Sequence, residues 1–316
     1  MGGLEERLVP AHGFALETVR VRGFDRDAPL RNLALPVVLP RALAHGLRVV
    51  DRFRPDVVMG VGGYVMAPAV AAARIRRIPY VLQVSEAHGL ANRLFRGGAA
   101  AACVTFPGDV AAFPTRHTVL TGYPLRPGFA RRVPSVPPAR LLVMGGSQGA
   151  RRLNQAVWGA LGALLDGFEE VVHLTGRQGE ETGRDLARPG YRPIAFSDDV
   201  PGLLGSSDLV LCRAGVGTCA ELTAVGVPAI VVPGTFGGRH QERNAAELER
   251  AGAAVRIADD NLTPESLLAA LHSLTPERLR SMAEASAALG RPEAASAIVQ
   301  VLEEVGGGRA AEGVPR

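Results

Sequence analysis

Two glycine-rich segments in the second half of the chain each follow a short apolar run and precede a helical pattern. One is Met144–Asn154, MGGSQGARRLN, and the other is Cys212–Glu221, CRAGVGTCAE. Glycine lets backbone N–H groups approach an anion closely, and a helix N-terminus adds unpaired donors and a favourable dipole. The pair predicts phosphate binding, whereas either segment alone is also explained by a turn that needs glycine for its geometry.

Side chains in and after these segments suit the remainder of a nucleotide sugar. Ser147 supplies a hydroxyl donor for a phosphate oxygen, and Thr218 falls in the first turn of its predicted helix. Glu221 lies one turn further on, where a carboxylate can accept bonds from two ribose hydroxyls; without a ligand it would only complement the helix dipole. Gln241 and Asn244 are three residues apart, so their amides share a helix face and suit sugar hydroxyls, with a solvated polar face as the alternative.

The segment FSDDV could contact a nucleobase. Phe196 could cover a uracil ring, and the Ser197 backbone could pair with the edge of the base. The two aspartates that follow are interpreted as a helix N-cap, and Asp259–Asp260 is interpreted in the same way, because Asp commonly precedes a helix. The sequence therefore predicts neither a metal site nor another cofactor.

The first half of the chain has a counterpart of the phosphate loops in Gly60–Pro68, GVGGYVMAP. Gly62 and Gly63 could admit a second pyrophosphate, and Tyr64 could cover it. A turn that requires positive φ explains the same glycines equally well.

Short apolar strands alternate with helical patterns along most of the chain. Runs of Val, Ile and Leu without polar alternation indicate strands buried on both faces, as in a parallel sheet covered by helices. Two such series predict two α/β domains. Helices are predicted at Leu153–Leu165, Gln241–Ala251 and Pro292–Glu304. Strands are predicted at Leu16–Val21, Asp56–Met59, Tyr80–Val84, Ala102–Phe106, His117–Leu120, Arg140–Met144, Glu169–Leu174, Arg192–Phe196, Asp208–Cys212, Ala229–Val232 and Ala254–Ile257.

The proline-rich segment RRVPSVPPAR, residues 131–140, predicts the boundary between the domains, because its prolines cannot continue a helix or a central strand. The sequence thus predicts an N-terminal domain over 1–130, a linker over 131–140 and a nucleotide-sugar domain over 141–291. Residues 292–305 are predicted to form a helix that packs back on the N-terminal domain, followed by a flexible tail over 306–316.

Composition favours a cytoplasmic protein with anionic ligands. Of 316 residues, 47% are hydrophobic, which is enough for two cores, and the net charge is +4. All the cationic Lys+Arg residues are arginines, and the basic residues do not alternate with aromatics as in a nucleic-acid surface. Cys103, Cys212 and Cys219 lie in apolar surroundings without metal spacing, which predicts buried reduced thiols. No signal peptide or membrane span is predicted.

One segment, Leu30–Val50, could contact a membrane surface. Its apolar stretch LALPVVLP is flanked by Arg31, Arg41, Arg48 and Arg52, and apolar anchors beside arginines suit an anionic bilayer. A pair of core helices is the alternative interpretation.

The motifs occur in one order: GGYV, GGSQGAR–LN, DDV, CRAG–GT–AEL, GVPAIVVP and R–Q–RN, with LVPAHGF near the start. This series, which covers nearly the whole chain, resembles the MurG family of glycosyltransferases. The resemblance implies a GT-B fold, that is, α/β with two Rossmann-like doubly wound domains and an interdomain cleft. It also implies an inverting transfer of N-acetylglucosamine from UDP-N-acetylglucosamine (UDP-GlcNAc) to lipid I, undecaprenyl-pyrophosphoryl-MurNAc-pentapeptide, which forms lipid II in peptidoglycan synthesis.

The resemblance also implies the surroundings and the site residues. The enzyme would lie peripherally on the cytoplasmic face of the cell membrane, contacting the anionic inner-membrane surface, with cell-wall synthesis proteins as further partners and no nucleic acid. Donor-binding residues would be Arg126, Ser147, Phe196, Ser197, Val216, Gly217, Thr218, Cys219, Ala220, Glu221, Gln241 and Asn244, and acceptor-binding residues would be Gly62, Gly63 and Tyr64.

Two departures from the family pattern concern catalysis. The family's N-terminal GGTGGH-type loop, whose histidine is the suspected general base, has no counterpart here, so no catalytic residue is predicted. The stretch after Leu82 reads QVSEAH, one residue shorter than the family's HEQN-type stretch, and His88 in it is interpreted as structural. The alternatives are a truncated or degenerate protein that binds the donor but is catalytically impaired, and a related lipid glycosyltransferase.

Overall fold

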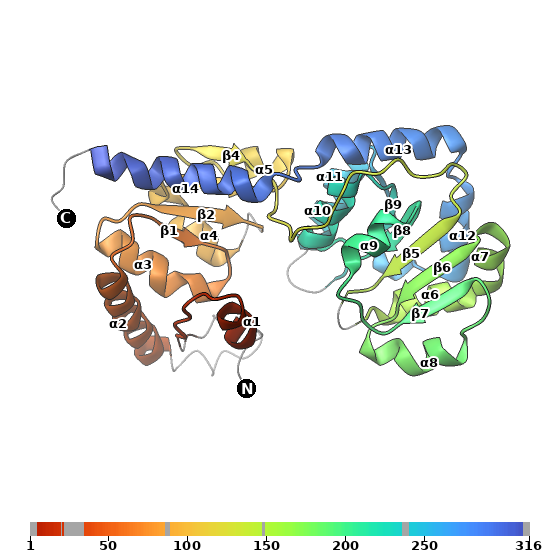
Figure 1. Ribbon diagram of the computed structural model, residues 1–316, viewed down its shortest axis with the longest axis horizontal. Coiled ribbons are helices and arrows are strands. Elements are labelled where there is room, and N and C mark those ends of the chain that lie inside the picture. The colour runs from red at the N-terminus through yellow and green to blue at the C-terminus, as the bar shows by residue number, and fades with distance from the viewer. Residues whose placement is uncertain are drawn as a thin grey trace. The chain divides into compact units, whose positions relative to one another are not determined.

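A computed structural model of the chain describes residues 5–19, 21, 35–85, 89–146, 149–235 and 240–311. The chain divides into two compact units (Figure 1). Unit 1 comprises residues 1–120 and 296–316, and unit 2 comprises residues 121–295. Each unit is an α/β body around one parallel sheet, as the two series of apolar strands predicted.

Unit 1 is built on four parallel strands in the order β1-β2-β3-β4. Their core residues are largely aliphatic and fully buried, with Tyr80, Phe95 and Phe113 filling one side of the sheet. The strands are β1 (Val58–Gly60), β2 (Tyr80–Val84), β3 (Ala101–Val104) and β4 (Thr118–Leu120), and the helices are α1 (Glu5–Ala11), α2 (Leu35–Phe53), α3 (Ala67–Ile75), α4 (Leu90–Phe95), α5 (Pro107–Ala112) and, from Ser296 onward, α14 (Ala294–Ala311).

Helix α14 runs along the sheet of unit 1 (Figure 1). Its residues Ile298 and Val301 are buried against Val81, Ala101 and Cys103 of β2 and β3. The helix continues to Ala311, six residues into the segment predicted as a flexible tail.

Unit 2 is built on six parallel strands in the order β10-β9-β8-β5-β6-β7. The chain starts at the central β5, proceeds to β6 and β7 on one side, and then continues with β8, β9 and β10 on the other. The strands are β5 (Arg140–Met144), β6 (Glu170–Leu174), β7 (Tyr191–Ile194), β8 (Leu209–Cys212), β9 (Ala229–Val231) and β10 (Ala254–Arg256), and the helices are α6 (Arg151–Gly159), α7 (Leu161–Gly167), α8 (Glu180–Asp185), α9 (Val200–Gly205), α10 (Val216–Val225), α11 (His240–Arg250), α12 (Pro264–His272) and α13 (Pro276–Leu289).

The proline-rich segment 131–140 is bound along unit 2 by one buried carboxylate. Asp208 forms an ion pair with Arg132 at 2.6 Å and accepts hydrogen bonds from the backbone N–H groups of Ser135, Ala139 and Arg140. A buried charge is tolerated when it is paired and hydrogen-bonded in this way. The boundary between the units falls at residues 120 and 121, ahead of this segment.

Ten of the eleven predicted strands are confirmed to within two residues at each end. The strand at Leu16–Val21 is wrong: residues 14–19 and 21 form no strand, and none of the four described strands of unit 1 pairs with them. The apolar pattern alone therefore did not place this segment at either edge strand of the sheet, β1 or β4. The helix predicted at Leu153–Leu165 is divided at Ala160 into α6 and α7, next to Gly159, where a Cβ atom would approach Pro264 Cγ to 2.6 Å.

Candidate functional site

The sheet of unit 2 has a topological switch point between β5 and β8. Ligands of doubly wound sheets bind outside the carboxyl ends of the strands at such a point. Both predicted phosphate segments lie there, because one follows β5 and the other follows β8. The Arg213 backbone N–H donates to the Met144 carbonyl at 3.2 Å, so the starts of the two loops are directly joined.

The loop after β5, residues 145–150, is closed tightly by its glycines. Gly146 and Gly149 have φ of +89° and +81°, and the Gly149 N–H donates to the Gly146 carbonyl at 2.9 Å. A Cβ atom on Gly149 would lie 2.5 Å from the Thr175 carbonyl oxygen, so only glycine fits between this loop and the end of β6. The predicted phosphate ligand Ser147 lies outside the described residues.

The loop after β8 opens a helix whose first turn faces the same edge. Gly215 is the N-cap of α10, so Val216, Gly217 and Thr218 form its first turn, as predicted. The ten-residue helix has no acidic residue in that turn, which leaves its positive end unneutralised by its own first residues. Gly217 lies close to Tyr123, since a Cβ atom there would be 3.8 Å from Tyr123 Cε1.

Cys219 and Ala220 are buried in the interior of α10, so of the predicted donor residues these two face the core. Burial, together with the nearby Glu221 carboxylate, raises the pKa of the Cys219 thiol to about 12. Burial also raises the pKa of Cys212 well above its usual range. The three cysteines are free and buried, as predicted.

Glu221 directly follows Ala220 on α10 and is half-buried. Burial raises the pKa of its carboxyl, and the positive charge of Arg126 acts in the opposite direction. Arg126 is exposed on the segment that follows β4. The structure therefore brings together, within unit 2, a carboxylate and a cation that the sequence placed 95 residues apart.

Gln241 and Asn244 lie on α11 and brace the neighbouring loops. Gln241 Oε1 accepts a hydrogen bond of 2.7 Å from the Gly234 N–H, just after β9. Asn244 Nδ2 donates to the Ala214 carbonyl at 3.0 Å, in the loop between β8 and α10. These two bonds orient both amides at the carboxyl edge of the sheet.

Phe196 and Ser197 follow β7 at the same carboxyl edge of the sheet. The Phe196 side chain is 59% exposed, so its ring is available to a planar ligand. The Ser197 hydroxyl accepts from the Asp199 N–H at 3.1 Å, and Asp199 accepts from the Gly202 N–H at 2.9 Å. The predicted N-cap role of Asp199 is thereby confirmed.

The N-cap interpretation of Asp259–Asp260 is wrong. Both residues lie in a 3-10 turn, Asp259–Asn261, and Thr263 caps the following helix α12. Asp259 instead pairs with Arg213 at 2.5 Å, and Arg213 also donates to the Val232 carbonyl. Arg213, just after β8, thus links that loop to the ends of β9 and β10. The guanidinium is largely shielded from water, and its charge is compensated by the charge-assisted hydrogen bond to Asp259.

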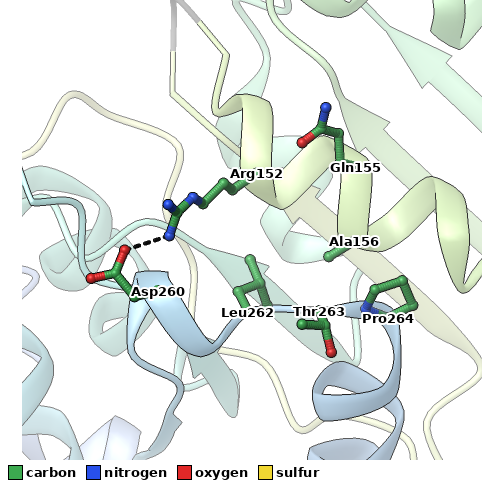
Figure 2. A pocket seen from close by; sticks show the side chains of 7 residues that line it. All are labelled: Arg152, Gln155, Ala156, Asp260, Leu262, Thr263 and Pro264. Carbon is green, nitrogen blue, oxygen red and sulfur yellow. Dashed lines mark hydrogen bonds and ion pairs between the residues drawn. The ribbon is translucent and has the colours of Figure 1, made fainter.

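A second arginine, Arg152 on α6, pairs with the neighbouring Asp260, and Figure 2 shows these two side chains pointing towards each other. A hollow of about 290 Å³ lies beside it, lined by Arg152, Gln155, Ala156, Asp260, Leu262, Thr263 and Pro264. None of the predicted donor residues lines this hollow, so it is not the candidate site. Arg152 pairs with both Asp259 and Asp260, so ion pairs connect the segment after β10 with α6, the helix that follows the β5 loop.

The corresponding loop of unit 1 follows β1. Gly62 and Gly63 have φ of +93° and +69°, so this turn requires glycine whether or not it binds a ligand. The Gly62 N–H donates to Met66 Sδ at 3.3 Å, and a Cβ atom on Gly62 would lie 3.7 Å from Ser85 Oγ. Tyr64 is 52% exposed and lies between the exposed Val61 and Val65.

The segment predicted as a possible membrane contact is helix α2 over its described part. Ala42, Gly46 and Val50 form its buried face, and a Cβ atom on Gly46 would lie 2.5 Å from the Pro68 carbonyl oxygen of α3. Val37 and the arginines at positions 41 and 48 follow at helical spacing on the exposed side. Arg31 and His88 lie outside the described residues.

Two features of the site were not predicted from the sequence. Tyr123 precedes Arg126 in the motif GYPLR, and its position beside the α10 N-terminus could have been inferred only by placing that segment at the switch point. The Arg213–Asp259 pair joins residues 46 apart. Within the described ranges, no three His, Cys, Asp or Glu side chains gather as a metal site, and no helix there is long and apolar enough to cross a membrane.

Comparison with known proteins places this arrangement in a family context. Residues 1–101 match the glycosyltransferase family 28 N-terminal domain, and residues 140–301 match its C-terminal domain. Over 333 residues the chain is 39% identical to the UDP-N-acetylglucosamine--N-acetylmuramyl-(pentapeptide) pyrophosphoryl-undecaprenol N-acetylglucosamine transferase of Desulforudis audaxviator, covering 96% of this chain and 88% of the relative. It is 37% identical over 328 residues to the enzyme of the same name from Nocardioides sp., covering 98% and 89%.

Solved structures agree. The crystal structure of Acinetobacter baumannii MurG is similar with a TM-score of 0.80 and 27% identity, over 96% of this chain and 88% of that chain. A calicheamicin glycosyltransferase shares the fold at 18% identity, with a TM-score of 0.68 over 98% of this chain and 89% of that chain.

Proposed function

The chain belongs to the MurG family of glycosyltransferases within glycosyltransferase family 28, and from this premise we propose that it transfers N-acetylglucosamine from UDP-GlcNAc to lipid I. The product is lipid II, the disaccharide precursor of peptidoglycan. The observation that carries the proposal is the convergence of two glycine-rich strand–helix junctions at the switch point of unit 2.

The donor occupies the carboxyl edge of unit 2. Its diphosphate lies between the loop 145–150, which contains Ser147, and the first turn of α10, where backbone N–H groups point out of the helix. Glu221 accepts from the two ribose hydroxyls, with Arg126 close to the nucleotide. Uracil stacks on the exposed ring of Phe196 and pairs with the Ser197 backbone.

The transferred sugar lies over α11. Gln241 and Asn244 each use one polar atom to hold a neighbouring loop, and the other atom of each amide bonds the sugar hydroxyls. An amide can donate to one hydroxyl and accept from another, which suits a hexose. UDP-GlcNAc and UDP-glucose differ only at one ring substituent, so selectivity between them reports this part of the site.

The reaction is an inverting displacement at C1 of the sugar. As the acceptor hydroxyl attacks, negative charge accumulates on the departing UDP. The N-terminal dipole of α10 is already oriented towards the proposed diphosphate position, so the free N–H groups of its first turn stabilise the transition state without reorganising. These donors supply the stabilisation that a divalent cation gives in other nucleotide-sugar enzymes, and the proposed transfer is independent of added metal.

The acceptor and the membrane are assigned to unit 1. The Gly62–Gly63 turn receives the pyrophosphate of lipid I, and Tyr64 with its exposed apolar neighbours contacts the start of the lipid chain. The exposed Arg41 and Arg48 of α2, beside Val37, attract anionic headgroups. The protein therefore acts peripherally, on the cytoplasmic face of the cell membrane.

The test is a transfer assay with UDP-GlcNAc, in EDTA, and a water-soluble lipid I analogue, in which product is separated from substrate by chromatography. Glu221→Ala is compared with Glu242→Ala, a matched removal of a carboxylate that pairs with Arg256 on the outer side of α11. Transfer by the unmodified chain and by Glu242→Ala, with strong loss in Glu221→Ala, supports the proposal. A folded chain that produces no disaccharide, or that gives equal rates in both variants, contradicts it.

A further inference from the structure

Four buried or half-buried polar side chains form a continuous chain of hydrogen bonds behind the β5 loop. Trp158 Nε1 lies 2.9 Å from the Tyr191 hydroxyl, which lies 2.9 Å from His173 Nδ1. His173 Nε2 lies 3.0 Å from Asn154 Oδ1, and Asn154 Nδ2 lies 2.8 Å from the Thr175 carbonyl oxygen. His173 and Thr175 are fully buried, and Asn154 and Tyr191 are nearly so.

The two ends of this chain and the neutral state of the buried His173 ring together fix the direction of every bond in it. The Thr175 carbonyl can only accept, so the Asn154 atom facing it is the NH₂ group, and Asn154 Oδ1 must accept from a protonated His173 Nε2. At the other end the Trp158 indole can only donate, so the Tyr191 oxygen accepts from it. Burial lowers the pKa of His173 to about 3, so the ring is neutral and, with its proton on Nε2, leaves Nδ1 unprotonated. The Tyr191 O–H therefore donates to His173 Nδ1.

The chain ends on the carbonyl against which the β5 loop is packed. Gly149 has no room for a Cβ atom, because that atom would be 2.5 Å from the Thr175 oxygen. Asn154 and Trp158 are both on α6, one turn apart, and α6 begins directly after the loop. The same hydrogen bonds thus connect the two segments that flank the loop, which are Thr175 just after β6 and the first turns of α6.

We infer that His173, together with Asn154 and Tyr191, is a positioning residue that fixes the β5 loop for the donor diphosphate. The inference rests on the proposed function, since that function places the diphosphate at residues 145–150. None of the three side chains touches the donor in this account. They act by setting the direction of the Thr175 carbonyl and hence the place of Gly149.

Loss of the Tyr191 hydroxyl would affect the Thr175 carbonyl through His173 and Asn154. Without its O–H donor, the buried His173 Nδ1 lone pair is unpaired, and the ring is held by hydrogen bonding at Nε2 alone. The ring and the Asn154 amide bonded to it can then turn together. The Asn154 NH₂ group thereby loses its fixed direction towards the Thr175 carbonyl beside Gly149.

The test compares the affinities of UDP and uridine, since only UDP carries the diphosphate. UDP is titrated by calorimetry and uridine by NMR, for the unmodified chain, Tyr191→Phe and His173→Gln. The matched control is Tyr80→Phe, which removes an equally buried tyrosine hydroxyl that donates to the Phe95 carbonyl in unit 1. Far-UV circular dichroism of each variant establishes that it is folded.

Tyr191→Phe is expected to weaken UDP about tenfold and uridine by less than about twofold. His173→Gln keeps one donor and one acceptor in place of the ring nitrogens, so it is expected to retain UDP affinity to within about threefold, and Tyr80→Phe is expected to change neither ligand. Equal losses for UDP and uridine in Tyr191→Phe, or no loss of UDP, overturn the inference. A folded, unmodified chain that does not bind UDP overturns the proposed function itself, which separates the two failures.

Nitrogen-15 NMR of the histidine rings gives a second readout, independent of ligand affinity. The account predicts that the His173 ring is protonated on Nε2 and remains neutral down to pH 4.5. A ring protonated on Nδ1, or a cationic ring at that pH, reverses the direction of the chain and overturns the inference.

Discussion

The carboxyl edges of the two sheets differ in how their glycine-rich loops are held. In unit 2, amide side chains on helices reach the backbone beside each loop: Gln241 binds Gly234, and Asn244 binds Ala214. At the β1 loop of unit 1, the Gly62 N–H meets Met66 Sδ, a weak acceptor, and Tyr64 is exposed.

This difference corresponds to the two substrates proposed for them. A diphosphate that leaves during the reaction is best stabilised by dipoles oriented before it binds, because they cost no reorganisation at the transition state. A lipid-linked acceptor presents an extended apolar chain as well as a charge, which suits an exposed apolar loop. We therefore expect perturbations of unit 2 to change nucleotide binding sharply, and perturbations of unit 1 to act more weakly.

The largest effect is expected from Gly149→Ala. The substitution combines a φ of +81° with a Cβ atom 2.5 Å from the Thr175 carbonyl oxygen, so it should lower the free energy of unfolding of unit 2 by about 3 kcal/mol or more. The control is Gly252→Ala, which has a similar φ of +78° but nothing within 4 Å, and should cost about 1–2 kcal/mol. Urea denaturation followed by fluorescence of Trp158, the single tryptophan, measures unit 2 directly. Equal costs would show that the loop is not tightly packed.

The buried histidine predicts a pH dependence of the same unit. The pKa of His173 is lowered to about 3 in the folded state, so the folded protein binds fewer protons there than the unfolded chain. Its contribution to stability is present above the unfolded pKa of about 6.5 and is lost as the pH falls towards 3, at up to about 1.4 kcal/mol per pH unit. Urea midpoints between pH 7 and 4.5 should fall less steeply in His173→Gln than in the unmodified chain. Parallel slopes would contradict the buried neutral ring.

Glu221→Ala is expected to weaken UDP-GlcNAc binding by about 1.5–3 kcal/mol, the range for a charged hydrogen-bond partner. The residue is half-buried on α10 near Arg126, so removal of its carboxylate leaves the ribose hydroxyls without an acceptor. Calorimetric titration measures the change. Unchanged affinity in a folded variant would remove Glu221 from the donor site.

The segment after β10 contains one ion pair that is shielded from water, Arg213–Asp259, and one that is exposed, Arg152–Asp260, and their contributions to stability should differ. Asp259→Asn should cost about 1–3 kcal/mol of stability, because Asp259 and Arg213 are largely shielded from water. Asp260→Asn should change stability by less than about 0.5 kcal/mol, because its side chain is 77% exposed. Both are read from urea denaturation. Comparable costs in the two variants would mean that Arg213 does not depend on Asp259.

In unit 1 the expected effect is on membrane binding. Replacing Arg41 and Arg48 by Ala should reduce binding to vesicles containing phosphatidylglycerol by about 1 kcal/mol per arginine, with no change for neutral vesicles. Arg184→Ala, an exposed arginine on α8 of unit 2, is the control. Sedimentation with vesicles at low and high salt measures the binding. Absence of binding at every salt concentration would contradict the membrane assignment.

Local patterns were sufficient to predict the strand–loop–helix junctions of the site. The loop after β5 and the first turn of α10 were predicted because a buried strand, glycines and a helical pattern are adjacent in the sequence. The partners of these junctions could not be predicted in the same way. His173 and Tyr191 meet because β6 and β7 are neighbours, and Arg213 meets Asp259 because β8, β9 and β10 follow in order.

The errors have the same origin. Asp259–Asp260 has the local signature of an N-cap, but a partly buried arginine from another loop takes Asp259 as its partner. Leu16–Val21 has the composition of a strand, yet its described residues pair with neither edge strand of unit 1, because composition alone does not determine strand pairing. Periodicity predicts the type of an element, while sheet order decides which side chains meet.

We propose that unit 2 carries a donor site whose described backbone donors are oriented before the ligand binds. Calorimetric titration of the intact chain with UDP-GlcNAc in EDTA, with UDP-glucose for comparison, tests this proposal. We expect binding without added metal and tighter binding of UDP-GlcNAc than of UDP-glucose. No binding by the folded chain, or binding that appears only when Mg²⁺ is added, would contradict it.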